Sequence, residues 1–426
     1  MTLIAADTHL SPSPEGPSPT SAPVWVGQLD VRRPIEAVEV ARTFGSALLL
    51  VTVDGVPSGQ ISVPLADGHA SADTIRATVL EEIGEALDHT PLPLAPVRYA
   101  LTVVVATRNR PDSVARCVRS LLRSTHQQLT VLVVDNDPDD DLTAGVVRDM
   151  DDHRVEYVRE DRRGTSAGRN RGLVEAVARG ARFVAFTDDD VEVDPGWVGR
   201  MASALAEPDV ACVCGPVMAA RLDSPAQRDA DAALGWRKGF ARRRFSLAEP
   251  PEDSPVFPFS PGLFGVGANM AVNVAVATEL GGFDPALGPG TPAKAGEDCE
   301  FMVRLVLAGH TLAYEPSAYV WHHHRASGDA LAGQLDGYAL GLGGYLTKIM
   351  LDPVGRAAAL RRIPAALNRL RSIGDRETAA ESTGSAGSHQ LKTLVTGPLA
   401  YLSARRAVRR AGGTVPPLVA SHPAGH

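Results

Sequence analysis

Three stretches of this sequence share one pattern, a run of apolar residues that ends in polar ones. Residues 101–111 read LTVVVATRNRP, residues 129–137 read LTVLVVDND, and residues 183–190 read FVAFTDDD. Uninterrupted β-branched runs are typical of parallel strands that are covered on both faces. After the first run, an apolar stripe with helical spacing is formed by Val114, Cys117, Val118, Leu121 and Leu122. Because strands and helices alternate, we predict a doubly wound α/β sheet.

The polar residues at the ends of these runs are the first candidates for a functional site. Ligands of doubly wound sheets bind beyond the carboxyl ends of the strands. There the chain places Thr107–Arg110, Asp135–Asp137 and Asp188–Asp190. A triplet of carboxylates suits Mg²⁺ or Mn²⁺, which prefer oxygen ligands and often share them with substrate phosphates. We interpret the equally acidic Asp139–Asp141 as only a solvated turn.

Further motifs follow in order along the chain. Residues 168–172 read GRNRG, residues 267–270 read GANM, residues 281–284 read GGFD, and residues 296–300 read GEDCE. Together with the three runs above, their order and spacing resemble a family-2 glycosyltransferase of the GT-A fold, from about Tyr99 to Arg325. The resemblance implies a doubly wound, Rossmann-like mixed sheet. It also implies transfer of a sugar from a nucleotide diphosphosugar.

The resemblance implies roles for individual residues as well. Nucleotide-sugar binding is implied for Thr107, Arg110, Asp135, Arg169, Asp188 and Asp189. Among these, Arg169 would lie against the base or the diphosphate, near a helix N-terminus where anions are favoured. Asp188 and Asp190 match the ends of the family's D-x-D motif, which implies that they bind Mn²⁺ or Mg²⁺. Asp298 matches the acceptor-activating base, and Asp284 would shape an acceptor loop and could contact the sugar.

The implied reaction needs these parts. Displacing a nucleoside diphosphate builds negative charge on the leaving phosphate, which a bridging cation stabilises. The acceptor hydroxyl is a poor nucleophile until a carboxylate takes its proton. Direct attack with a single base inverts the anomeric configuration. We therefore expect an inverting transferase that uses a nucleotide diphosphosugar, with UDP favoured, and a glycan, lipid-linked or small-molecule acceptor.

A run of three histidines provides further candidate metal ligands. His322, His323 and His324 directly follow a short apolar segment, and strand alternation puts His322 and His324 on the same side. Neutral imidazole is a good ligand for Mn²⁺-type ions. We predict that one of the pair, His322 ahead of His324, binds the metal. The alternative is a surface histidine run or a supporting role behind the pocket.

The chain divides into four predicted regions. Residues 1–23 form a disordered lead-in, residues 24–96 a small α+β unit with a linker, residues 97–325 the glycosyltransferase domain, and residues 326–426 a helical, basic C-terminal region with a flexible tail. Inside the third region, residues 219–261 form a long, proline-containing excursion suited to an acceptor-specific insertion.

The C-terminal region has two possible partners. Residues 355–410 hold eleven Lys or Arg and three acidic residues, interleaved with Ala and Leu. A stripe of Leu360, Ile363, Leu367 and Leu370 could pack on the catalytic domain, or it could dip into lipid while the arginines meet anionic headgroups. We expect packing.

Composition and local signals exclude several classes of protein. The net charge of −8 argues against a nucleic-acid binder, and the four cysteines lack metal-finger spacing. There is neither a signal-peptide pattern nor an apolar run of transmembrane length. A cytoplasmic protein is expected, with peripheral contact at the inner face of the membrane as an option. A sugar-phosphate nucleotidyltransferase and a non-catalytic nucleotide-sugar-binding module remain alternatives, although the nucleotidyltransferase would need a glycine-rich loop that Thr107–Pro111 lacks.

Overall fold

The computed structural model describes residues 22–236, 238–260, 262–325, 327–362 and 384–418. Within residues 384–392 only the helical backbone is described. The predicted lead-in over residues 1–23 therefore lies almost entirely outside the described residues. Most of the apolar stripe predicted in the C-terminal region also lies outside the described residues, because only Leu360 of its four members is described.

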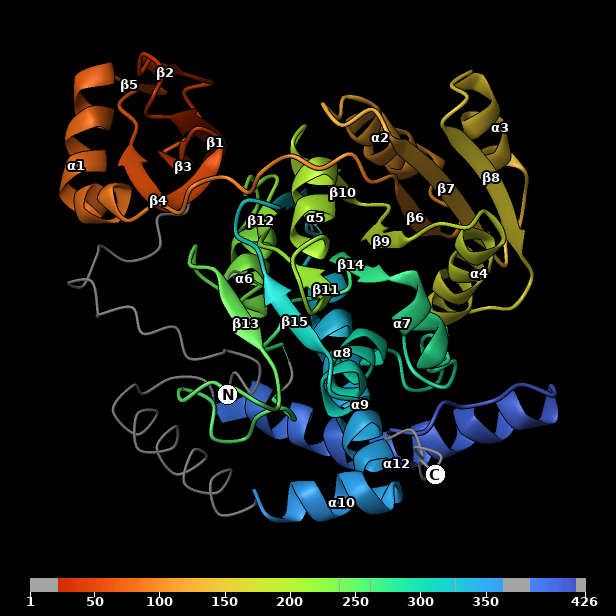
Figure 1. The fold of residues 1–426 in the computed structure, drawn as a ribbon. Helices are drawn as coiled ribbons and strands as arrows, with labels where there is room; N and C mark the ends of the chain where they lie inside the picture. Colours follow the sequence, from red (N-terminus) through yellow and green to blue (C-terminus); the bar gives the residue numbers. More distant parts are fainter. Residues whose placement is uncertain (1–21, 237, 261, 326, 363–383, 419–426) are drawn as a thin grey trace.

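An eight-stranded mixed sheet forms the centre of the molecule (Figure 1). Its strands, in spatial order, are β13 (Arg243–Phe245), β15 (Thr311–Tyr314), β11 (Val210–Cys214), β14 (Asn269–Asn273), β9 (Phe183–Asp188), β6 (Leu101–Thr107), β7 (Leu129–Asn136) and β8 (Val155–Glu160). The four strands β9, β6, β7 and β8 are parallel. Strand β14 is antiparallel to both of its neighbours, β9 and β11. The predicted doubly wound mixed sheet is confirmed.

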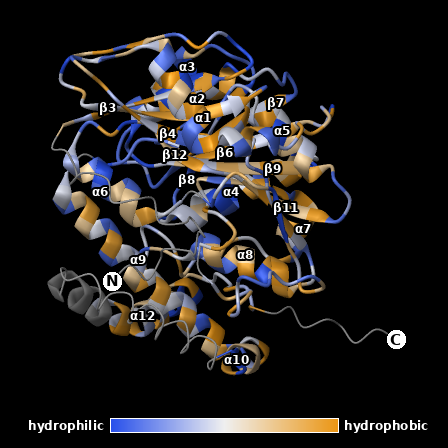
Figure 2. Ribbon diagram, turned by 90° about the vertical axis from the view of Figure 1, so that its left-hand side faces the viewer, coloured by the Kyte–Doolittle hydropathy of each residue, from blue (hydrophilic) through white to orange (hydrophobic). Residues whose placement is uncertain are grey.

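Helices cover both faces of the sheet, which explains the uninterrupted apolar strands. One face packs against α2 (Pro111–Leu122), α3 (Leu142–Asp149) and α5 (Trp197–Leu205); the other packs against α4 (Thr165–Ala178), α7 (Val274–Glu279) and α8 (Glu297–Leu307). Within β6, Val103 and Val105 face the first layer and Val104 the second, and all three are fully buried. Figure 2 shows hydrophobic residues concentrated along β6, β9 and β11 between these helices.

A second, three-stranded sheet sits at the carboxyl edge of the main one. It consists of β10 (Val191–Val193), β16 (Val320–His322) and β12 (Val217–Ala219), with β16 in the middle. Strands β10 and β16 are antiparallel and pair Val191 with His322. This pairing brings the end of the Asp188–Asp190 triplet beside the histidine run.

The N-terminal unit has its own small core. Strand β3 (Ser46–Val53) pairs with β1 (Val24–Asp30) in parallel and with β4 (Val56–Pro64) as an antiparallel hairpin, while α1 (Ala72–Asp88) packs on β4. The two-residue strands β2 (Val38–Glu39) and β5 (His69–Ala70) pair beside them. The unit therefore combines a β-hairpin with a helix. A hydrogen bond of 2.8 Å from Gln28 Nε2 to Tyr319 Oη connects the unit to the larger domain.

The C-terminal helices pack against the larger domain. They are α9 (Gly328–Leu351), α10 (Pro353–Leu360) and α12 (Gly384–Arg410). Helices α9 and α12 cross where Gly343 meets Gly397, so closely that a Cβ on Gly397 would lie 2.6 Å from the Gly343 Cα. None of the described helices is long and apolar enough to cross a membrane.

A buried ionic network fastens these helices to the domain. The Lys348 ammonium of α9 pairs with Asp284 at 2.8 Å and with Glu300 of α8 at 2.9 Å, and Tyr401 of α12 donates to Asp284 at 3.0 Å. All four side chains are buried. Asp284 is therefore a structural anchor and is absent from the lining of the cavity described below, which contradicts the prediction that it could contact a sugar.

Candidate active site

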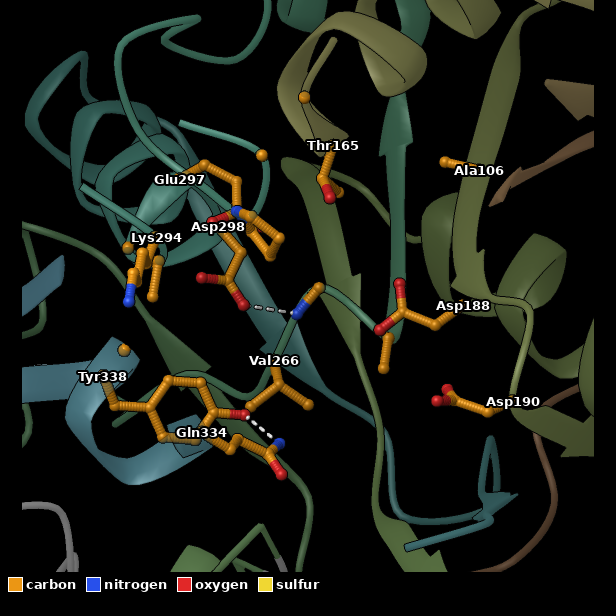
Figure 3. A pocket seen from close by; sticks show the side chains of 18 of the residues that line it. Ala106, Thr165, Asp188, Asp190, Val266, Lys294, Glu297, Asp298, Gln334 and Tyr338 are labelled. Atoms are coloured by element: carbon orange, nitrogen blue, oxygen red, sulfur yellow. Dashed lines mark hydrogen bonds between the residues drawn. The ribbon is translucent and has the colours of Figure 1, made fainter. Parts of the chain in front are cut away.

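A cavity of about 880 Å³ opens at the carboxyl edge of β6 and β9. Figure 3 shows two facing walls: Ala106, Asp188 and Asp190 lie on one side, and Asp298, Lys294 and Tyr338 on the other. Of the residues predicted from sequence, the cavity is lined by Thr107, Arg110, Arg169, Asp188, Asp189, Asp190, Asp298 and His322. Asp135 and His324 are absent from this lining.

The acidic triplet forms most of the first wall, and its three members have different surroundings. Asp188 is the most open, with 36% of its side chain exposed, and it accepts a 3.0 Å bond from Arg169. Asp189 is buried and accepts from Thr107 Oγ1 at 2.6 Å and from Arg110 Nη1. Burial raises the pKa of Asp189 to about 7, against the opposing charge of Arg110. Asp189 thus holds Thr107 and Arg110 in place.

Asp190 lies at the junction with the histidine run. Burial disfavours its ionised form, but His322 and Arg110 outweigh that effect and hold the pKa of Asp190 well below its usual range. Its Oδ1 lies 3.2 Å from His322 Nε2, and its Oδ2 lies 3.1 Å from Arg110 Nη1. The backbone fixes this arrangement, because His323 N donates to the Asp190 carbonyl at 2.9 Å. His324 points instead to Asp231, 3.6 Å away.

The pair Asp190 and His322 fits a divalent cation. Two ligands on adjacent octahedral positions, each about 2.1 Å from the ion, lie about 3 Å apart. The observed 3.2 Å between Oδ1 and Nε2 matches this spacing. Throughout the described ranges, no three His, Cys, Asp or Glu side chains form a ready-made metal cage. Such an ion would need further oxygens from a substrate, which is how Mg²⁺ is usually bound beside phosphates.

Asp298 stands on the opposite wall, in the first turn of α8. Its Oδ2 accepts from Gly267 N and its Oδ1 from Cys299 N, both at 2.7 Å. Each oxygen keeps a lone pair that these bonds do not use, so Asp298 can still accept a proton or a hydroxyl hydrogen. Gly267 must lack a side chain, since its Cβ would lie 2.6 Å from Arg169 Nη1.

Arg169 connects the two walls. Its Nη2 donates to Asp188 and its Nη1 to Glu297 of α8, both at 3.0 Å, and only 4% of its side chain is exposed. Burial raises the pKa of Glu297 to about 7, with Asp298 adding to the shift and Arg169 opposing it. The predicted contact of Arg169 with a nucleotide stays a prediction, but the structure gives this side chain a bridging position.

Asp135 lies behind the cavity rather than in it. It pairs in register with Thr107, is completely buried, and accepts from Tyr157 Oη at 3.1 Å. Burial raises the pKa of Asp135, partly offset by that hydrogen bond. Its neighbour Asn136 lines the cavity instead. The GANM motif also supports the site from behind, because Asn269 is buried and bonds Trp197 Nε1 at 2.8 Å.

Two parts of the cavity wall were not predicted as site residues. Helix α9 contributes Gln334 and Tyr338, which share a hydrogen bond of 2.8 Å. The predicted excursion 219–261 contributes Trp236, whose ring packs edge-on against His322, and Lys238. The excursion's position agrees with an acceptor role. No sequence motif marks Gln334 or Tyr338, since their helix falls beyond the predicted domain boundary at residue 325.

Comparison with known proteins finds a family that part of this chain resembles. Residues 102–265 match the family model described as glycosyl transferase family 2. The pre-mycofactocin glycosyltransferase of Mycobacterium tuberculosis is 29% identical over 243 residues, which is 56% of this chain and 45% of that protein. The succinoglycan biosynthesis protein ExoO of Rhizobium meliloti is 29% identical over 239 residues, 53% of this chain and 62% of that protein. The chain spans roughly half the length of these curated relatives.

Among solved structures, the mannosyltransferase PcManGT of Pyrobaculum calidifontis, in complex with GDP-Man and Mn²⁺, covers 78% of this chain and 93% of its own. Its TM-score is 0.46 at 18% identity. The family match covers the strands and helices that build the first wall of the cavity, including the whole Asp188–Asp190 triplet. The segment from residue 102 to residue 265 is therefore similar to glycosyl transferase family 2.

Proposed function

We propose that the chain transfers a sugar from a nucleotide diphosphosugar to an acceptor hydroxyl, with inversion at the anomeric carbon and UDP as the favoured nucleotide. One observation carries this proposal. A single cavity of about 880 Å³ holds the carboxylate–histidine pair of Asp190 and His322 on one wall and the carboxylate of Asp298 on the other. These are the two groups that the reaction needs, one for the leaving diphosphate and one for the acceptor.

The donor would occupy the side of the first wall. Arg110 and the open carboxylate of Asp188 border the space where a diphosphate would meet the cation held by Asp190 and His322. Mn²⁺ or Mg²⁺, when bound there, would act as a Lewis acid that stabilises the charge of the leaving diphosphate. Thr107 would close the nucleotide pocket at the end of β6, and Asp135 would support it from behind at the end of β7.

Asp298 would act as the general base. Its carboxylate faces the cavity between two backbone donors, which fix its orientation without supplying a counter-charge. The neighbouring Glu297 is already paired with Arg169 and is buried, so it is unsuited to attack a sugar. Asp298 is a carboxylate without a cationic partner among the described residues, while the adjacent carboxylate of Glu297 is paired with Arg169. This arrangement favours a single displacement and hence inversion.

A donor screen tests the proposal. The protein is incubated with UDP-, GDP- and dTDP-sugars in the presence of Mn²⁺, and release of the nucleoside diphosphate is followed. We expect slow hydrolysis of at least one donor and its loss in a chelator. Release of pyrophosphate from a nucleoside triphosphate and a sugar phosphate would instead identify a nucleotidyltransferase. Tight binding of donors without any turnover would identify a non-catalytic module.

A binding experiment tests the metal separately. Because the protein supplies fewer than three ligands, Mn²⁺ alone should raise the Tm little, whereas UDP and Mn²⁺ together should raise it strongly. A ligand at 100 times its Kd stabilises by about 2.7 kcal/mol. A full shift with UDP in the presence of chelator would contradict the metal assignment.

A further inference from the structure

The charges that line the cavity are unevenly paired. On the acidic side, Asp188 and Glu297 share Arg169, while Asp189 and Asp190 share Arg110. Asp298 is held by backbone amides instead of a cation. Because each arginine is shared by two carboxylates, these four acids and two arginines keep a formal charge of −2. Asp298 adds one more negative charge that no arginine or lysine of the described ranges neutralises.

Basic side chains are in surplus. Arg163, Lys238, Lys294 and Arg325 line the cavity, and within the described ranges none of them forms an ion pair. Arg108, by contrast, also lines the cavity but pairs with Asp137 and Asp139 outside it. Four positive charges thus face the open space without a counter-charge from the described protein.

The donor does not account for this surplus. One divalent cation would balance the charge of −2 that the four acids and their two arginines keep, and a nucleotide diphosphosugar brings roughly two further negative charges. Even if Arg163 and Arg325 both paired with the leaving diphosphate as its negative charge increases, Lys238 and Lys294 would still have no anionic partner among the described residues. Lys294 lies on the wall of Asp298 and Tyr338, across the cavity from Asp188 and Asp190 (Figure 3).

Lys238 is the more informative of the two lysines because it is partly buried. Its Nζ donates to Gly235 O at 2.7 Å and lies near Gly262, while the segment is anchored by Tyr314, whose hydroxyl donates to Gly239 O at 3.2 Å. Burial lowers the pKa of Lys238 to about 8. An ammonium kept out of water without a counter-ion is unfavourable, so an anion that enters here would gain from pairing with it.

We propose that the acceptor carries an anionic group, a phosphate or a carboxylate, which Lys238 and Lys294 bind on the Asp298 side of the cavity. The inference rests on the proposed function, because it takes the first wall as the donor side. The inference states that the acceptor, the second substrate, is negatively charged. It also gives a role to Lys238, which the excursion over residues 219–261 places in the cavity wall.

The test fills the donor side first. Protein saturated with UDP and Mn²⁺ is titrated calorimetrically with glucose 6-phosphate, glucuronate and neutral glucose, three probes that share one ring and differ in charge. We expect one or both anions to bind and glucose to bind at least tenfold more weakly. Lys238→Gln should weaken anion binding about tenfold or more, the effect of losing one charged hydrogen bond. Lys238→Arg should retain most of it.

Controls separate this inference from the proposed function. Arg33→Gln removes an equal charge from an exposed site in the N-terminal unit and should change nothing. Lys294→Gln, at an exposed position, should weaken the anion even if a Lys238 variant fails to fold. Failure of UDP and Mn²⁺ to bind would refute the proposed function. Normal UDP binding with equal affinity for glucose and both anions, or anion binding unchanged in both lysine variants, would refute the anionic acceptor alone.

Discussion

Replacing Asp298 by asparagine removes a proton acceptor while keeping the shape of the side chain. If Asp298 is the general base, turnover should fall by about 10²–10⁴-fold, the usual contribution of such a group. At 1.36 kcal/mol per factor of ten, this corresponds to about 2.7–5.4 kcal/mol of transition-state stabilisation. The affinity for UDP and Mn²⁺ should stay within about threefold, because Asp190 and His322 lie on the opposite wall.

The same substitution has a structural cost that must be measured beside the kinetics. Asp298 accepts two backbone bonds, from Gly267 N and Cys299 N, both at 2.7 Å. An asparagine has one carbonyl oxygen, so one of these amides would face an NH₂ group and lose its partner. We expect a loss of about 1–3 kcal/mol in the free energy of unfolding. Activity should therefore be assayed well below the Tm of the variant.

The assay follows nucleoside diphosphate release from the best donor, with UDP affinity measured by calorimetry on the same samples. Asp140→Asn is the matched control, since Asp140 is exposed in the second acidic triplet and does not line the cavity. It should leave both turnover and affinity unchanged. Collapse of UDP affinity with turnover preserved would refute the reasoning, because Asp298 would then be a binding or structural residue.

Three further predictions follow from the same geometry. Asp190→Ala should abolish turnover and remove the stabilisation that Mn²⁺ gives to bound UDP, measured as a thermal shift, whereas Asp140→Ala should do neither. His322→Gln should weaken the Mn²⁺ dependence of UDP binding, while His324→Gln should leave it unchanged; equal effects would place the metal elsewhere. Lys348→Met should lower the free energy of unfolding by about 3–5 kcal/mol in denaturant titrations, because it leaves the buried Asp284 without a cationic partner, whereas Glu300 keeps Arg304; a neutral result would mean that the network does not hold the C-terminal helices.

The sequence predicted the fold best where an apolar run of residues forms a strand that is buried on both faces. The runs at residues 101–107 and 183–188 became central strands because a strand covered on both faces can be apolar at every position. The polar residues after them came together because parallel strands end at one edge. Strand β14 runs from Asn269 to Asn273 and does not extend back to Gly265. Gly265 has a φ of 136°, which is incompatible with a continuous strand.

The rest of the site depends on contacts between distant segments. Gln334 and Tyr338 belong to a helix whose sequence shows no motif, and they reach the cavity because α9 is held against α8 and α12. The pairing of Asp190 with His322 depends on the register of β10 with β16, which no local pattern reveals. The GGFD motif suggested that Asp284 could contact a sugar, but in the structure Asp284 pairs with Lys348 in the core.

Arg169 shows how these distant contacts could set the reaction geometry. In the proposed reaction the anomeric carbon lies between the leaving diphosphate at the first wall and the attacking hydroxyl beside Asp298, and displacement requires these groups to be in line at a fixed separation. The guanidinium spans that separation, because its two terminal nitrogens hold Asp188 and Glu297 at 3.0 Å each. A lysine, with one nitrogen, could not hold both carboxylates in the same way. Arg169 of the GRNRG motif thus holds the two walls at a fixed distance through these two hydrogen bonds. This role does not depend on a contact with the nucleotide.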